Sequence, residues 1–236
     1  MNRKLTAGLL IAAAVQTTTA FTALGTVFNY PDILKQPVEE VLAAFRASQT
    51  AVTGWFTLLA ASAALFAPIA VGVGRLSASP PMRAAVPVGI AAAGVQVVGL
   101  LRWPLLVPRY AADAASTDPT VAAAARHSFI TAHEILGQLV GETLGYLLTA
   151  AWTLLVLAAL GRRIGGVWFL VVGSVSAVLI LGGVLSPLQL PVIDAANFVG
   201  YVIWSAWLVA FAVLLLRRPR AVTHTPTPSA LADSRS

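Results

Sequence analysis

The stretch TVAAAARHSFITAHEILGQLVGETLGYLLTAAWTLLVLAAL, residues 120–160, decides the fold. It is rich in Ala, Leu, Ile and Val, and it predicts one unusually long helix. The apolar part of this helix, about 135–160, is long enough to cross a bilayer, which needs about 20 residues. Positions three and four residues apart share one face of a helix. The stretch should therefore carry a single polar stripe, formed by His127, Thr131, Glu134, Gln138, Glu142 and Gly145.

The amino-acid composition indicates that the chain is an integral membrane protein. Of its 236 residues, 58% are hydrophobic and 10% are charged, whereas soluble domains have about 25% charged residues. The sequence contains no cysteine, which excludes disulfides and thiolate metal sites. The net charge is +6, but the basic residues lie between hydrophobic runs. This pattern is typical of membrane topology signals, so we expect no nucleic-acid partner.

The hydrophobic runs predict an all-α, six-span transmembrane bundle that forms one domain over residues 1–216. The expected spans are 5–28, 51–73, 84–107, 135–160, 167–185 and 195–216. The first run is longer than the apolar stretch of about 7–15 residues in a signal peptide. We therefore expect a retained span, with a cleaved signal peptide as the alternative. Residues 217–236 predict a disordered basic tail.

A short amphipathic helix is predicted between the first two spans, over Val38–Ser48. Its apolar face should carry Val38, Val41, Leu42 and Phe45, and it is too short to cross a bilayer. We expect it to lie at the membrane interface or to cap the bundle.

Basic residues define the orientation. Both termini and the second and fourth loops hold ten of the fifteen Lys and Arg residues, while the other side holds five of them and eight of the nine acids. The positive-inside rule then places both termini in the cytoplasm. In this orientation Glu142 lies about 27 Å above the inner end of its span at Leu160, at 1.5 Å per residue. Since the hydrocarbon core is about 30 Å thick, Glu142 should lie just under the outer surface.

Several polar residues are expected at that same level. Ionisable groups inside membranes are costly, so they suggest function. Glu142 and Glu134 are the candidate general acids, and the candidate ligand-binding residues are Arg102, Arg109, His127, His133, Gln138, Asp194 and Asn197. Together they predict a polar, outward-facing cavity.

Each candidate also has a structural interpretation. Glu142 and Gln138 could act as interhelical hydrogen-bonding glue. Arg102 and Arg109 could contact lipid headgroups, and Asp194 could be a helix N-cap. His127, His133 and Glu134 lack the i, i+4 double-histidine spacing of helical zinc sites, so neither a metal nor a cofactor is expected.

The glycines of the long helix point to close packing. Gly141 and Gly145 form a pair of small residues four apart. Such a pair lets another helix approach closely, here beside Glu142.

Three groups of residues resemble an uncharacterised bacterial integral membrane family, domain of unknown function 4386. They are Arg102-Trp103-Pro104 with Val107-Pro108, His133-Glu134 with Gly141-Glu142-x-x-Gly145-Tyr146, and Asn197-Phe198-x-Gly200-Tyr201-x-x-Trp204. The resemblance extends to about Arg218. It implies a multi-pass protein of the bacterial inner membrane, with no established activity.

Three functions remain open at this point. The chain could bind a small molecule or lipid in the outer cavity, it could be a membrane-embedded enzyme that acts on a lipid or isoprenoid through a buried Glu, or it could be a structural or regulatory partner. The sequence does not define the oligomeric state.

Overall fold

The computed structural model describes residues 2–188 and 190–217, and every regular element in these residues is helical. Six stretches are long and apolar enough to cross a membrane, which confirms the six-span prediction. They are α1 (Arg3–Phe28), α3 (Gln49–Gly74), α4 with α5 (Pro80–Leu105, Val107–Asp113), α6 with η2 and α7 (Pro119–Ala132, His133–Leu144, Gly145–Leu160), α8 with η3 (Arg162–Gly182, Gly183–Leu188) and α9 (Pro191–Arg217). The predicted tail lies outside the described residues from residue 218 onward.

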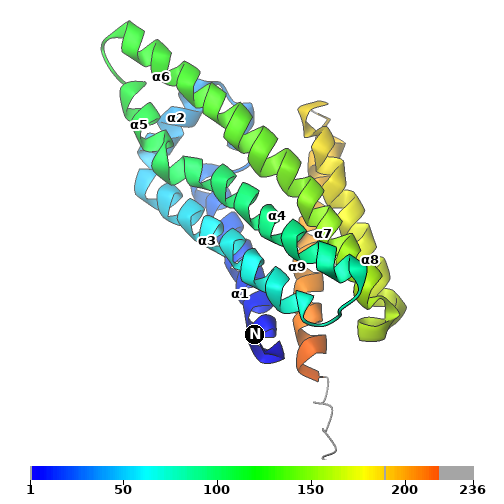
Figure 1. The fold of residues 1–236 in the computed structure, drawn as a ribbon. Helices are drawn as coiled ribbons and strands as arrows, with labels where there is room; N and C mark the ends of the chain where they lie inside the picture. The colour runs from blue at the N-terminus through cyan, green and yellow to red at the C-terminus, as the bar shows by residue number, and fades with distance from the viewer. Residues whose placement is uncertain (1, 189, 218–236) are drawn as a thin grey trace, which may run out of the picture.

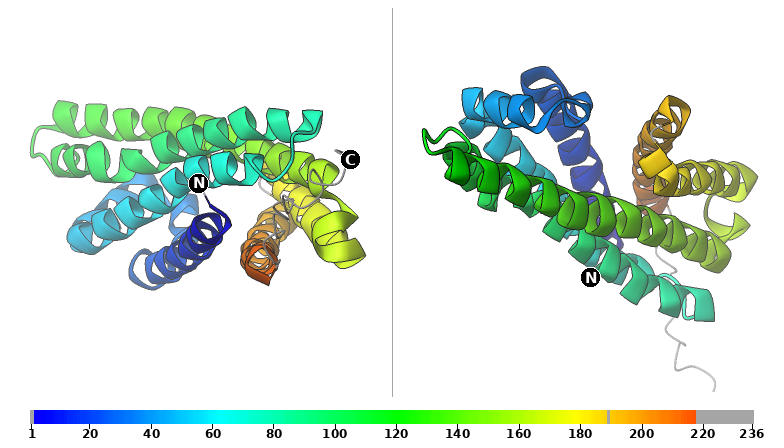
Figure 2. Two further views of the ribbon diagram at one scale, coloured as in Figure 1. Left: turned by 60° about the horizontal axis from the view of Figure 1, so that its bottom comes forward. Right: turned by 90° about the horizontal axis from the view of Figure 1, so that it is seen from above.

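The spans form a ring in chain order (Figures 1 and 2). Helix α1 packs on α3, α3 on α4, α4 on α7, α7 on α8 and α8 on α9, and α9 packs back on α1 to close the ring. The first residue of α1 and the last of α9 lie at the same end of the bundle (Figure 1). We call this the terminal end, and the opposite end the distal end.

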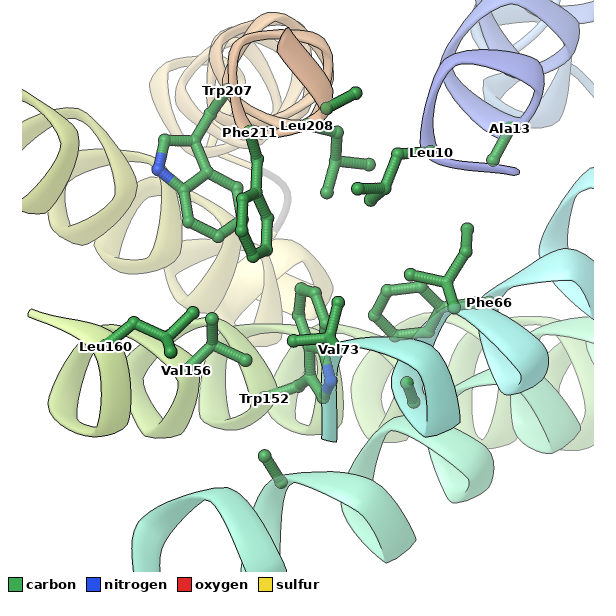
Figure 3. Packing of buried hydrophobic residues seen from close by; sticks show 14 of the residues in the cluster. Leu10, Ala13, Phe66, Val73, Trp152, Val156, Leu160, Trp207, Leu208 and Phe211 are labelled. Carbon is green, nitrogen blue, oxygen red and sulfur yellow. The ribbon is translucent and has the colours of Figure 1, made fainter. Parts of the chain in front are cut away.

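Large aromatic side chains fill the interior at the terminal end. Trp152 from α7 and Phe66 from α3 meet edge to face, with 4.7 Å between ring centroids. Trp207 and Phe211 of α9 lie in the same cluster, together with Leu10 of α1 (Figure 3). The described residues therefore close this end of the ring with apolar packing.

A second apolar cluster lies at the distal end, centred on the fully buried Trp103. It joins residues of α1, α2 (Val38–Ala47), α3, α4, α5 and α6, and among the described residues it includes none from α8, η3 or α9.

The connection between α1 and α3 forms part of the distal cluster. Helix α1 ends at Phe28, and its C-cap Asn29 adopts a left-handed backbone conformation (φ 51°) that asparagine tolerates. A single 3₁₀ turn, η1 (Asp32–Lys35), leads into α2. Helix α2 buries Val41, Leu42 and Phe45 as predicted, so this amphipathic helix is confirmed.

The predicted long helix is confirmed and runs without interruption from Pro119 to Leu160 (Figure 1). Asp118 caps its first turn, since its carboxylate accepts from the backbone N–H of Thr120 at 2.8 Å. At 1.5 Å per residue the helix is at most about 63 Å long, about twice the hydrocarbon thickness. Arg126 ties the distal part of this helix to α2, since it approaches Glu39 at 3.5 Å. Arg46 of α2 donates to the carbonyl of Ala111, which joins α2 to α5.

Candidate functional site

The middle of the long helix is π-helical. Segment η2 (His133–Leu144) uses hydrogen bonds between residues five apart instead of four. The polar stripe predicted at α-helical spacing is kept only in part. Gln138 and Glu142 share one cavity, whereas His127 and Glu134 are exposed outside it. π-helical turns occur frequently at functional sites, so this segment is a candidate functional site.

Glycines bring η2 into backbone contact with α4. A Cβ atom at Gly99 would lie 2.6 Å from the Cα of Gly141, so the two helices touch with no side chain between them. One turn further along, Gly145 faces the side chain of Gln96. The predicted close approach at Gly141 and Gly145 is thereby confirmed, and the partner helix is α4.

A cavity of about 160 Å³ lies between η2 and η3. It is lined by Gln138, Glu142, Thr143, Gly183, Ser186 and Pro187. Four of these six residues carry polar side chains, and Glu142 is half-buried among them. No side chain fits at Gly183, because the amide of Asn197 and the ring of Tyr146 occupy the space where it would project.

Arg102 occupies a separate, enclosed position on α4. It is 5% exposed and donates to the carbonyl of Gly99. Its Nη2 lies 3.3 Å from Nδ1 of His133, and since arginine has only donors, that nitrogen is the acceptor. Gly137 of η2 lies directly against the guanidinium, which leaves Nε without a hydrogen-bond partner among the described residues. Arg102 therefore holds the first turn of η2 and does not line the cavity.

Tyr30 lies outside the spans, and the charges of Glu142 and Arg102 both act on the pKa of its phenol. Burial raises the pKa of the Tyr30 phenol to about 12; the Glu142 carboxylate adds to the rise and the Arg102 guanidinium opposes it. Tyr30 thus stays protonated at neutral pH and can act as a hydrogen-bond donor.

The remaining candidates do not line the cavity, although Asn197 packs against Gly183 of its wall. Arg109 is highly exposed and pairs with Asp113 at 3.5 Å. Asp194, in the first turn of α9, pairs with Lys35 at 3.5 Å. Asn197 is buried and donates to the carbonyl of Ile180 at 2.9 Å, an interaction that joins α9 to α8.

A buried hydrogen-bonded group toward the middle of the bundle was not predicted as a unit. Gln96 donates to the hydroxyl of Thr149 at 2.9 Å, and Trp204 donates to the hydroxyl of Thr153 at 2.8 Å. Thr153 in turn donates to the carbonyl of Thr149. These bonds tie α4 and α9 to α7. The signals in the sequence were the 149/153 spacing of the two threonines and the polar Gln96 within an apolar span.

Searches against protein-family models, curated proteins and solved structures found no match to this chain. The resemblance to domain of unknown function 4386 stays a prediction.

Proposed function

We propose that this multi-pass membrane protein binds a small molecule or lipid in the cavity between η2 and η3. The observation that carries the proposal is the environment of Glu142. Its carboxylate is half-buried in a polar cavity, and no cation lies within 4 Å of it among the described residues. A carboxylate kept at such a position without a partner suggests a functional role.

Charge distribution supports the position of this site in the outer leaflet of a bacterial inner membrane. Among the described residues, the terminal end holds seven basic side chains and no acidic one: Arg3, Lys4, Arg75, Arg83, Arg162, Arg163 and Arg217. All eight described acids belong to the distal half. The positive-inside rule then puts the cavity on the outer side.

The aromatic cluster at the terminal end favours binding over passage. Trp152, Trp207 and Phe211 are at most 1% exposed and pack with the other spans. A solute in the distal cavity would meet this packed layer before it reached the terminal end.

Replacing Glu142 with Gln tests the proposal. The variant keeps the shape of the side chain but loses its charge, and it replaces one acceptor oxygen with a donor NH2 group. We expect a bacterial polar lipid extract to raise the melting temperature of the wild-type protein in detergent, since a ligand that binds only the folded state stabilises it by RT ln(1 + [L]/Kd). At a ligand concentration of about 100 Kd this is about 2.7 kcal/mol. The rise should be lost in Glu142→Gln.

Glu40→Gln is the matched control, because Glu40 is an exposed acid on α2 at the same end of the bundle. It should retain the full stabilisation. If Glu142→Gln instead lowers the ligand-free melting temperature and no extract stabilises the wild type, the residue is structural glue. Glu142-dependent conversion of a lipid in the extract, detected by mass spectrometry, would support the enzyme alternative instead.

A further inference from the structure

The cavity lining carries one carboxylate, and each of its four polar side chains can accept a hydrogen bond from a ligand. Glu142 contributes a carboxylate, Thr143 and Ser186 contribute hydroxyl oxygens, and Gln138 contributes an amide oxygen. No Lys, Arg or His lines the cavity. A ligand that donates several hydrogen bonds and carries positive charge fits this lining better than an anion.

Among the described residues no cation pairs with Glu142 within 4 Å, although the charge of Arg102 attracts its carboxylate from a greater distance. The Arg102 guanidinium is committed to Gly99 and His133 and is enclosed by Gly137. Lys35, the cation that pairs with Asp194 at the start of α9, is shared between Asp194 and Asp32. Burying a carboxylate without a partner is costly, so a cationic ligand would relieve that cost.

Exposed apolar side chains lie next in sequence to the cavity residues, on both η2 and η3. Leu139 and Leu144 on η2, and Leu185 and Leu188 on η3, are 38–62% exposed. These leucines belong to segments of two membrane spans. Exposed leucines at this location suit contact with acyl chains, and an amphiphile would satisfy both the polar cavity and its apolar border.

The volume of the cavity and the chemistry of its lining limit which cationic group can bind. A cavity of about 150 Å³ holds a molecule of the size of benzene, so this one of about 160 Å³ accepts a small group rather than a whole lipid headgroup. Quaternary ammonium ligands are recognised by aromatic cages, and no aromatic residue lines the cavity. A primary ammonium has three N–H donors for the carboxylate, hydroxyl and amide oxygens.

We infer that the cavity binds the primary ammonium group of a membrane amphiphile, with Glu142 as its counterion. This inference rests on the proposed function and specifies the ligand class of the same site. Ser186 of η3 and Gln138 of η2 provide the neutral acceptors on opposite walls.

Two phospholipids that differ only in N-methylation provide the test. Delipidated protein in detergent is titrated with dioleoyl phosphatidylethanolamine, dioleoyl phosphatidylcholine or free ethanolamine, and thermal unfolding is followed. At about 100 Kd we expect phosphatidylethanolamine to raise the melting temperature by about 5–10 °C. Phosphatidylcholine and free ethanolamine should give much smaller shifts. Glu142→Gln should lose the response to phosphatidylethanolamine, and Glu40→Gln should keep it.

The other outcomes overturn separate parts of the inference. Equal shifts with both phospholipids would contradict ammonium specificity but leave lipid binding intact. A shift with ethanolamine alone would make the ligand a water-soluble amine. If the polar lipid extract stabilises the protein through Glu142 while all three probes fail, the ligand class is wrong and the proposed function stands. If the extract fails too, both are wrong.

Discussion

Gly99→Ala is expected to destabilise the bundle strongly. The added methyl would lie 2.6 Å from the Cα of Gly141 and 2.9 Å from the carbonyl oxygen of Leu136. Both are backbone atoms, so no side-chain rotation can relieve the clash, and α4 must move away from η2. Overpacking of this kind costs about 1–3 kcal/mol and occasionally more. Thermal unfolding in detergent measures the loss.

Gly94→Ala is the control, because Gly94 lies on the same helix and a Cβ there meets no atom within 4 Å. Alanine favours helix over glycine by about 1 kcal/mol, so this variant should match or exceed the wild type. Equal loss of stability in both variants would show that α4 and η2 are not in backbone contact. Because Glu142 follows Gly141 directly, Gly99→Ala should also weaken ligand stabilisation.

Features that depend on local periodicity and length could be predicted from the sequence. The six spans, the helix from Pro119 to Leu160 and the buried face of α2 all follow from where apolar residues recur. The length of a hydrophobic run predicts the length of its helix, and the spacing of its apolar residues predicts the buried face. Both properties depend on one segment alone.

The pairing of polar residues could not be predicted in the same way. Topology places Arg102, His133, Lys35 and Asp194 near one level, but helix rotation decides that Arg102 meets His133 and that Asp194 meets Lys35. The π-helical segment adds a second difficulty. Its bonds span five residues instead of four, so positions counted at α-helical spacing drift around the helix, although Gln138 and Glu142 still share the cavity.

Trp103→Ala should produce the largest loss of stability of any single side-chain truncation at the distal end. The indole is fully buried and stacks on Phe56 of α3 with 4.7 Å between ring centroids and 6° between planes. Phe28 of α1, Phe45 of α2 and Phe129 of α6 surround it at 5.2–6.1 Å. Truncation opens a cavity shared by five helices, for which a cost of about 3–5 kcal/mol is typical.

Trp103→Phe separates packing from polarity. The indole N–H of Trp103 is buried without an acceptor among the described residues, so phenylalanine removes an unsatisfied donor while it keeps most of the ring contacts. We expect this variant to lose much less stability than Trp103→Ala. Trp168→Ala, at a half-exposed indole on α8, should cost little in the same unfolding assay. A Trp103→Ala protein that unfolds like Trp168→Ala would mean that the distal cluster does not hold α2 and α6 against the spans. The cavity beside η2 would then lack the rigid support on which selective binding depends, since Phe129 of this cluster stacks on His133, the first residue of η2.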